Sequence, residues 1–483
     1  MKDNNIQSLD DVLPKAPGHV HLLGICGVGM VGLARLFMSL GANVTGSDQA
    51  FYPPMSELLN DMGVQIMEGY KPANLLRRPD LAVVGNVIRS VNPEAKELSH
   101  QGIPHTSMAG ALRTYFLKDR IPVVVTGTHG KTTLTSMIAW ILFDQGLDPS
   151  FFVGGIPTNF GCNSRLGQGQ FFVIEGDEYD TAYFDKTPKF LHYMANVVVL
   201  TSIEFDHADI YNDIDEIKSQ FVKLLSSVPS HGAVVACSDY NAVLDVIGAC
   251  KCDVHLYGSG NDLEWSFQGL REQGTGLTLE ILAKGAKLIT GTLPIFGAHN
   301  ALNALAAIAT ASRLGVAPDR AMKSMSKFLG VQRRQQIYGH ISGVTVIDDF
   351  AHHPTAVRLT CDAIKSRYPE KRVIAVFEPR TNTSRRSIFQ KDYATSFAGA
   401  DLIVLREPPA GRNDNPLDLF DSGKLANDLG MAGQKAVAFR NADQILDYLM
   451  DILQSGDIVL LMSNGNFEGL RSRLLKKLDE VVR

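Results

Sequence analysis

One loop in the sequence has residue types that suit the binding of phosphate groups. It follows the apolar β-branched run of residues 123–125 and precedes an apolar periodic segment that ends at Leu142. In the order strand, glycine-containing loop and helix, backbone N–H groups and the positive end of the helix point at an anion. Lys131 would contact the β- and γ-phosphates of a nucleotide, and the Thr132 hydroxyl would ligate Mg²⁺. The complete loop consists of Gly127, Thr128, His129, Gly130, Lys131, Thr132 and Thr133.

This loop is a variant of the general phosphate-loop pattern, because Val125 stands where that pattern has its first glycine. The alternative interpretation is a simple strand–helix turn with a solvated Lys131. The order of strand, loop and helix favours phosphate binding over that alternative.

A second glycine motif lies near the start of the chain. Gly27, Gly29 and Gly32 form a G-x-G-x-x-G pattern between a predicted strand, residues 19–23, and a predicted helix. Asp48 follows Gly32 by sixteen positions, at the end of a second predicted strand. This pattern is typical of a diphosphate site whose carboxylate binds a ribose hydroxyl. A turn that merely needs small residues is the alternative, and a real site could hold either NAD or a nucleotide sugar.

Polar side chains follow several apolar runs farther along the chain. Residues 171–174 lead to Glu175 and the acidic residues just after it, where a Mg²⁺ ligand is expected downstream of a phosphate loop. The predicted strand 197–203 leads to Asp206 and His207. His207 fits a metal ligand and a solvated loop residue equally well.

Two more clusters precede predicted helices. Asn300 and Asn303 lie three positions apart and would share one helix face. The alternative is that Asn300 caps the helix and Asn303 lies on the protein surface. The predicted strand 344–347 leads to two aspartates and two histidines before Pro354. Strands that alternate with helices predict mostly parallel sheets, with function at the carboxyl ends of the strands.

Bulk properties indicate a globular chain of several domains. A length of 483 residues corresponds to roughly three domains. The net charge of −5 argues against sequence-independent binding of nucleic acid. The polar start of the chain and the shortness of its apolar runs predict neither a secretory signal nor membrane insertion. Six scattered cysteines favour reduced thiols of the cytoplasm.

The motifs resemble, in order and spacing, those of the Mur ligases, bacterial enzymes that use ATP to build the peptide of cell-wall precursors. The resemblance covers the whole chain. It implies an ATP-dependent, amide-bond-forming ligase of the bacterial cytoplasm that uses Mg²⁺, with small molecules as substrates. It rests on the phosphate loop, residues 175–178, Asp206 with His207, residues 297–303, Arg334 and residues 349–354.

The implied fold is α/β with three domains. Residues 1–118 would form a Rossmann-like domain that binds UDP-N-acetylmuramate. Residues 119–329 would form a central, P-loop ATPase-like domain that binds ATP. Residues 330–483 would form a Rossmann-like α/β domain that binds ATP and the incoming peptide. No oligomeric state is implied.

The resemblance also implies roles for individual residues. The first glycine loop would bind the UDP part of the sugar nucleotide together with Ser47, Asp48, Asn163 and Arg165. Thr132, Glu175 and His207 would hold Mg²⁺. The ATP contacts beyond the phosphate loop would be His299, Asn300, Asn303, Arg334, Asp349 and His352, and the catalytic residues would be Lys131, Glu175, His207 and Arg334.

Some strings resemble particular members of the family. Residues 52–55, 177–186, 204–209 and 378–383 resemble those of enzymes that join a preformed tripeptide, L-alanyl-γ-D-glutamyl-meso-diaminopimelate, to UDP-N-acetylmuramate in the recycling of cell-wall peptide. Such a reaction would pass through an acyl phosphate. The alternatives are a sibling ligase that adds L-alanine and, from another class, a nicotinamide-dependent oxidoreductase. The expected peptide contacts are Glu378, Arg380, Asn382, Ser463 and Asn464.

Overall fold

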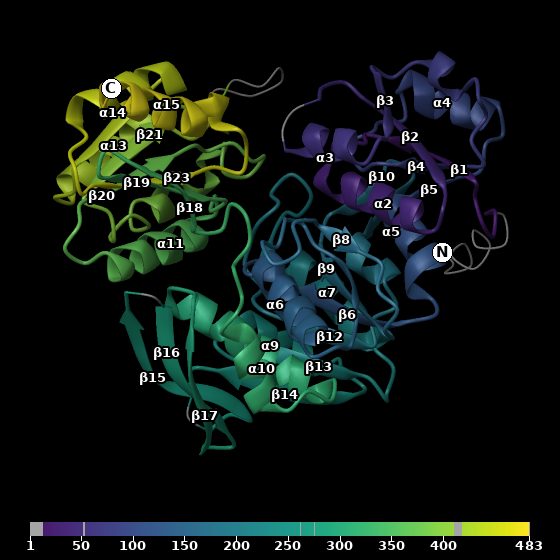
Figure 1. Ribbon diagram of the computed structural model, residues 1–483, viewed down its shortest axis with the longest axis horizontal. Coiled ribbons are helices and arrows are strands. Elements are labelled where there is room, and N and C mark those ends of the chain that lie inside the picture. Colours follow the sequence, from purple (N-terminus) through teal and green to yellow (C-terminus); the bar gives the residue numbers. More distant parts are fainter. Residues whose placement is uncertain (1–12, 52–53, 261, 275, 410–417, 483) are drawn as a thin grey trace.

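The computed structural model describes residues 13–51, 54–260, 262–274, 276–409 and 418–482, which form three α/β lobes in chain order (Figure 1). Residues 1–12 of the expected first domain and residues 52–53 of the string 52–55 lie outside the described residues. Each lobe contains its own main sheet, which confirms the predicted α/β class with three domains. No helix in the described ranges is long and apolar enough to cross a membrane.

The first lobe has a fully parallel sheet in the order β3-β2-β1-β4-β5. Its strand order reverses between β1 and β4, and ligands of open parallel sheets bind at such a switch point, outside the carboxyl ends of the strands. The glycine loop connects β1 to α2 there. The elements are β1 (His19–Leu23), α2 (Val28–Ser39), β2 (Asn43–Asp48), α3 (Met55–Asp61), β3 (Gln65–Glu68), η1 (Pro72–Leu75), β4 (Leu81–Val84), α4 (Pro93–His100), β5 (His105–Ser107), α5 (Met108–Leu112) and η2 (Arg113–Leu117).

The central lobe is built around β6 (Ile121–Thr126), which pairs in parallel with β9 (Phe171–Gly176) and β12 (Val197–Leu200). Residues 123–125 are fully buried, because helices or neighbouring segments cover both faces of a central parallel strand. One face packs on α6 and α9, and the other is continuous with the apolar core of the first lobe. β12 ends three residues earlier than the predicted strand.

The complete central sheet has ten strands in the order β17-β16-β15-β14-β13-β12-β6-β9-β7-β8. Its antiparallel arm, β15 to β17, is a feature that the strand–helix alternation did not predict. The remaining elements of the lobe are α6 (Lys131–Asp144), β7 (Ser150–Phe152), β8 (Ser164–Arg165), the hairpin β10 (Asp180–Ala182) and β11 (Asp185–Pro188), η3 (Lys189–His192), α7 (Ile214–Ser227), β13 (Ala233–Cys237), α8 (Asn241–Ile247), β14 (Asp253–Gly258), β15 (Trp265–Gln273), β16 (Gly276–Ala283), β17 (Ala286–Leu293), α9 (Ala298–Arg313) and α10 (Pro318–Met325).

The third lobe has six strands in the order β18-β19-β23-β20-β21-β22. Only the edge pair of β18 and β19 is antiparallel among them, in agreement with the predicted mostly parallel sheet. The elements are β18 (Gln336–Ile341), β19 (Val344–Asp349), α11 (Pro354–Arg367), β20 (Val373–Phe377), η4 (Ser387–Phe389), α12 (Gln390–Tyr393), β21 (Leu402–Arg406), α13 (Ser422–Met431), β22 (Ala436–Phe439), α14 (Ala442–Ile452), β23 (Ile458–Met462), η6 (Phe467–Gly469) and α15 (Leu470–Val482).

Candidate functional site

A cavity of about 900 Å³ lies where the three lobes meet. Gly27 and Gly29 of the first lobe line it, as do the phosphate loop of the central lobe and the third-lobe segment that includes His352. Cavities of this size hold small ligands and cofactors. The lobes therefore contribute jointly to one candidate site.

The phosphate loop connects β6 to the N-terminus of α6, as predicted. Gly127 and Gly130 have positive φ angles of 125° and 79°, in a region that favours glycine. A Cβ atom on Gly130 would lie 2.6 Å from Oδ1 of Asn303, and one on Gly127 would overlap the backbone of Ser202. These two glycines are therefore required by both conformation and packing. Val125 replaces the usual first glycine without conflict because it is a buried member of β6.

Lys131, the first residue of α6, is held by two acceptors. Its Nζ donates to the carbonyl of Gly127 at 2.7 Å and to Oε2 of Glu178 at 3.0 Å. Burial opposes the charge of Lys131, but the carboxylates of Glu178, Asp177 and Glu175 together outweigh burial, and the pKa of Lys131 is raised. The pKa of Glu178 is lowered to about 2, since its buried carboxylate accepts from Lys131 and His207. The two form a buried ion pair.

Glu178 is the site residue for which the sequence predicted no specific role. Its carboxylate bridges Lys131 and His207, whose Nε2 lies 2.9 Å from Oε1 of Glu178. The only available signal was its place in the acidic string after β9. That string predicts carboxylates near the loop but not which one contacts the lysine.

Glu175 lies at the carboxyl end of β9, beside the phosphate loop. Thr132 Oγ1 donates to its Oε1 at 2.9 Å, and the backbone N–H of Gly154 donates to its Oε2 at 2.7 Å. Burial and the neighbouring Asp177 raise the pKa of Glu175. A buried carboxylate and a hydroxyl that face a phosphate loop are ligands suited to Mg²⁺.

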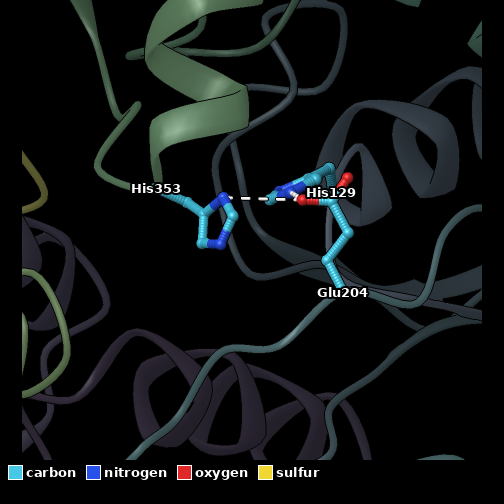
Figure 2. Close-up of side chains that lie close together, drawn as sticks. All are labelled: His129, Glu204 and His353. Atoms are coloured by element: carbon cyan, nitrogen blue, oxygen red, sulfur yellow. Dashed lines mark hydrogen bonds and ion pairs between the residues drawn. The ribbon is translucent and has the colours of Figure 1, made fainter. Parts of the chain in front are cut away.

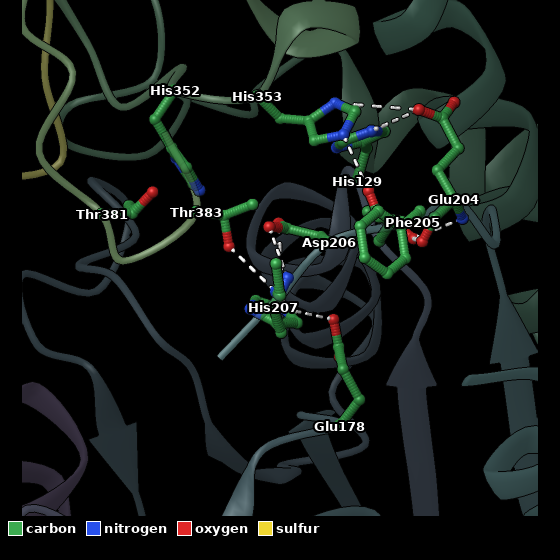
Figure 3. Close-up of polar contacts among 12 residues, drawn as sticks. His129, Glu178, Glu204, Phe205, Asp206, His207, His352, His353, Thr381 and Thr383 are labelled. Carbon is green, nitrogen blue, oxygen red and sulfur yellow. Dashed lines mark hydrogen bonds and ion pairs between the residues drawn. The ribbon is translucent and has the colours of Figure 1, made fainter. Parts of the chain in front are cut away.

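His207 occupies a strained position next to this cluster. Its φ angle is 57°, which is uncommon for a residue other than glycine and marks functional or tightly determined positions. Its backbone N–H donates to Oδ1 of Asp206 at 2.7 Å (Figure 3). The ring of Tyr179 packs against its imidazole, with the two ring centroids 4.1 Å apart. Burial lowers the pKa of His207, but the hydrogen bond and charge of Glu178 together with the charge of Asp206 outweigh burial, and the pKa is raised. Through Glu178, His207 is brought to Lys131.

Arg334 reaches this cluster from the third lobe. Its Nη2 lies 3.3 Å from Oγ1 of Thr132, and its guanidinium stacks over the ring of Phe350 at 4.6 Å. Asp349 instead accepts backbone N–H groups of Gln335 and Ala351, both at 2.7 Å, and burial raises its pKa. Arg334 thus faces the phosphate loop, whereas Asp349 shapes the segment that carries Arg334.

The predicted nucleotide residues of α9 line another part of the cavity. Asn303 is nearly buried, and its Nδ2 donates to Oδ1 of Asn300 at 3.2 Å. Asn300 in turn donates to the carbonyl of Phe296, and Gly297 is the N-cap of α9, so Asn300 is not the cap. Burial lowers the pKa of His299 to about 4, and its imidazole is therefore neutral.

The first glycine loop is organised by Asp48, whose Oδ2 accepts the backbone N–H of Cys26 at 2.9 Å. A Cβ atom on Gly29 would lie 2.7 Å from Sδ of Met108, and one on Gly32 would lie 2.9 Å from Nδ2 of Asn163. Packing therefore explains the small residues at two of the three glycine positions.

The other predicted sugar-nucleotide residues serve contacts within the protein. Ser47 Oγ donates to the buried carboxylate of Glu94 at 2.9 Å. Asn163 Nδ2 donates to the carbonyl of Val28 at 2.6 Å, and Arg165 pairs with Asp148 at 2.5 Å. Asn163, the residue just before β8, thereby forms a hydrogen bond between this segment and α2. Their contacts with a sugar nucleotide stay predictions.

The predicted peptide residues gather at the carboxyl ends of β20 and β23. Ser463 Oγ donates to Oε2 of the fully buried Glu378 at 2.6 Å. Oε1 of Glu378 and Oδ1 of Asn464 are buried without a hydrogen-bond partner. The guanidinium groups of Arg380 and Arg406 lie 3.9 and 3.7 Å from Glu378. Asn382 is apart from this cluster.

Asn382 takes part in a contact between the central and third lobes. Its Nδ2 donates to Oδ2 of Asp209 at 2.8 Å. The third lobe contacts the central segment 204–209 at further points, through His353 to Phe205 (Figure 3). Thr355 contacts Glu204, and Thr383 contacts Ala208. This segment carries His207.

Two lysines of the central lobe, Lys218 and Lys223, are both on α7. Lys218 donates to Asp245 at 2.8 Å and Lys223 to Gln220 at 3.1 Å. Neither is among the described residues that line the cavity.

Three family models match the chain in succession: the Mur ligase family catalytic domain over residues 19–119, the Mur ligase middle domain over 125–311 and the Mur ligase glutamate ligase domain over 333–465. The chain is 38% identical to UDP-N-acetylmuramate–L-alanyl-γ-D-glutamyl-meso-2,6-diaminoheptandioate ligase of Escherichia coli, covering 94% of this chain and 97% of that one. It is 34% identical to UDP-N-acetylmuramate–L-alanine ligase of Geotalea daltonii, over 95% and 98% of the two chains. The crystal structure of a murein peptide ligase from Psychrobacter arcticus superposes with a TM-score of 0.74, at 35% identity over 96% of this chain and 99% of that chain. The chain belongs to the Mur ligase family.

Proposed function

We propose that this enzyme joins L-alanyl-γ-D-glutamyl-meso-diaminopimelate to the carboxylate of UDP-N-acetylmuramate, with conversion of ATP to ADP and phosphate. The name of the E. coli relative states the same two reactants. The observation that carries the proposal is the shared cavity, which brings the first glycine loop, the phosphate loop and Arg334 to one space. A ligase that phosphorylates a sugar-nucleotide carboxylate needs all three in reach of each other.

The residues around Thr132 fit a Mg²⁺ ion. The Thr132 hydroxyl and the Glu175 carboxylate are hydrogen-bonded to each other, and Glu175 is partly buried without a cationic hydrogen-bond partner. Mg²⁺ favours few protein oxygens and completes its shell with water and phosphate. Bound there, the ion would neutralise phosphate charge and polarise the phosphoryl group. Lys131, the residue before Thr132, connects these ligands to Glu178 and His207.

Lys131 would act on the γ-phosphate. A carboxylate is a poor electrophile and is itself anionic, so it must be converted to an acyl phosphate before an amine can attack it. The Nζ of Lys131 now donates to Glu178 and Gly127. Phosphate oxygens would accept the same donors and would have their negative charge stabilised in place.

The incoming amine must lose a proton, because amino groups are mostly protonated near neutral pH. His352 is a suitable acceptor. Its Nδ1 lies 3.0 Å from the carbonyl of Phe350, which can only accept, so Nδ1 carries the proton and Nε2 has a free electron pair. Burial lowers the pKa of His352 and keeps the ring neutral. Because Nε2 of His207 is already engaged by Glu178, we favour His352 as the base.

The polar cluster at Glu378 supports a peptide as the acceptor. A tripeptide presents carboxylates and an ammonium group, for which Arg380 and Glu378 are complementary partners. Arg380 is half-exposed, whereas Glu378 is buried and its Oε1 has no hydrogen-bond partner. A short amino acid would leave such buried polar groups unpaired, and that penalty favours the longer acceptor.

Mass spectrometry of the products tests this proposal. Purified enzyme with ATP, Mg²⁺ and UDP-N-acetylmuramate is given either the tripeptide or L-alanine, and release of phosphate is measured alongside. We expect UDP-N-acetylmuramoyl-tripeptide as the favoured product. If L-alanine is the better acceptor by kcat/KM, the enzyme is an L-alanine ligase and the proposal is wrong.

A further inference from the structure

Two histidines and a glutamate meet between the central and third lobes. His129 belongs to the phosphate loop, Glu204 follows β12, and His353 is the N-cap of α11 (Figure 2). Nε2 of His129 lies 3.2 Å from Oε2 of Glu204, and Nδ1 of His353 lies 3.7 Å from the same oxygen. One ligand atom from each residue fits within 4.8 Å of the others.

Hydrogen bonds fix the tautomer of His353. Its Nε2 lies 3.2 Å from the carbonyl of Phe205, and since a carbonyl only accepts, Nε2 carries the proton. Nδ1 therefore presents an electron pair. The only described donor near it is the backbone N–H of Thr355, at a long 3.3 Å. Nδ1 of His353 and Oε2 of Glu204 are thus two acceptors that face each other.

The protonation states agree with this geometry. Burial lowers the pKa of His353 to about 4, so its imidazole is neutral near pH 7. The pKa of Glu204 is lowered to about 2 despite its burial, because it accepts from His129 and Thr355. A metal ion would replace the proton that Nε2 of His129 donates to Glu204, and this proton would be released to solvent. A neutral imidazole and a carboxylate are the forms in which these side chains bind metal ions.

We propose that His129, Glu204 and His353 form a binding site for a transition-metal dication such as Zn²⁺, separate from the Mg²⁺ site. Two imidazole nitrogens and one carboxylate oxygen are a ligand set that Zn²⁺ uses, with an open fourth position. With Zn–ligand distances of about 2.0–2.1 Å, tetrahedral ligands lie roughly 3.3–3.4 Å apart. The two separations from Glu204 of 3.2 and 3.7 Å are close to that value.

The surroundings already contain the partners that hold such ligands in place. Histidines that bind metal ions usually donate their other ring N–H to a carbonyl or carboxylate, as His353 does to Phe205. Thr355 Oγ1 donates to Oε2 of Glu204 at 2.7 Å and orients its carboxylate. Mg²⁺ prefers oxygen ligands, so the nitrogen ligands discriminate between the two kinds of ion.

An ion at this site would bridge two lobes. His129 and Glu204 belong to the central lobe and His353 to the third, so the ion would hold the third lobe against the phosphate loop in the arrangement described. In many enzymes the opening of closed lobes for product release limits turnover, and Zn²⁺ should therefore slow turnover while it stabilises the protein. The site does not depend on which acceptor the enzyme uses.

Crystals of the unaltered full chain grown with Zn²⁺ and excess Mg²⁺ test the proposal directly. We expect an anomalous difference peak at the zinc edge within bonding distance of all three side chains. Peaks only at other groups, such as Glu175 with His207 or Cys250 with Cys252, would overturn the assignment. So would the absence of any peak.

Titration calorimetry with Zn²⁺ alone provides a second readout. Loss of a residue that is only hydrogen-bonded to a metal ligand lowers metal affinity by about 10–100-fold. Glu204→Gln and His353→Gln each remove a ligand itself, so each should weaken Zn²⁺ binding by about 100-fold or more. His255→Gln is the matched control, because His255 pairs with Glu264 in another part of the central lobe and should leave the affinity unchanged. Wild-type affinity in both site variants contradicts the proposal. If a variant does not fold, the anomalous peak of the unaltered chain decides.

Discussion

Replacement of Glu178 by glutamine should destabilise the central lobe in the absence of nucleotide. The change keeps the size of the side chain but removes the charge that pairs with Lys131 at 3.0 Å and with His207 at 2.9 Å. The fall in the pKa of Glu178 from 4.5 to about 2 corresponds to roughly 3 kcal/mol, at about 1.4 kcal/mol per pKa unit. Breaking one partner of a buried ion pair costs about 3–5 kcal/mol, which agrees. His207 can release its proton in the variant, so we expect the lower end of that range.

The pH dependence has a definite sign. Because folding lowers the pKa of Glu178, its contribution is fully present above pH 4.5 and is lost as the pH falls toward about 2. The difference in stability between the wild type and Glu178→Gln should therefore shrink as the pH falls below 4.5. Because Glu178 also raises the pKa of His207, the difference should decrease as well when the pH rises through the pKa of His207. An effect that grows in acid would contradict the ion-pair explanation.

Nucleotide should rescue the variant. Phosphate oxygens would accept hydrogen bonds from Lys131 in place of Glu178. ATP with Mg²⁺ should therefore reduce the difference in stability between the wild type and Glu178→Gln by at least half. Urea denaturation followed by tryptophan fluorescence reports on this lobe, since both tryptophans of the chain, Trp140 and Trp265, lie in it. The matched control is Asp185→Asn. The pKa of Asp185 is also lowered to about 2 by a histidine, His192, and neither residue lines the cavity.

The control should lose less stability, because Asp185 is more exposed, and its loss should not depend on nucleotide. Two results would refute the reasoning. One is a Glu178→Gln variant as stable as the wild type without nucleotide. The other is a loss of stability that ATP leaves unchanged.

Three further substitutions test the site residues. Lys131→Ala should lower turnover by about 10²–10³-fold or more, because one fixed electrostatic group is lost, and near-normal ligation with normal folding would exclude its role. Glu175→Ala should raise the Mg²⁺ concentration needed for half-maximal turnover, while the affinity for UDP-N-acetylmuramate, measured by calorimetry, stays the same. If the apparent affinities for Mg²⁺ and for UDP-N-acetylmuramate fall equally, Glu175 does not act as a metal ligand. Arg380→Ala should raise KM for the tripeptide far more than KM for ATP, and a uniform change in both would remove Arg380 from the peptide site.

Local sequence signals were sufficient for much of this fold. The apolar β-branched run of residues 123–125 predicts a buried parallel strand, and the glycines and polar residues after it predict the loop between β6 and α6. The antiparallel arm was missed because β15 to β17 do not alternate with helices. Their residues are partly polar, and their pairing depends on two hairpins that a strand–helix pattern does not include.

Contacts between distant residues account for what the sequence did not indicate. Glu178 is 47 positions from Lys131, and only the meeting of the β9 end with the phosphate loop makes it the counter-ion. Asn382 is 173 positions from Asp209, so no local pattern could place its side chain against the central lobe. The sequence identified polar residues at strand ends, and the tertiary structure determined how those residues are paired.

The segment 204–209 links the chemistry of two lobes. It carries His207 in a left-handed conformation that costs of order 1–3 kcal/mol and persists only if surrounding contacts impose it. Those contacts come from both sides, with Glu178 in the central lobe and with Thr355, Thr383 and Asn382 in the third lobe. Because the third lobe also carries the candidate peptide cluster at Glu378, the docking of that lobe completes the acceptor side and fixes His207 at the same time. The acyl phosphate would then form only when the third lobe is docked and excludes water from the site. Exclusion of water would protect the acyl phosphate from hydrolysis.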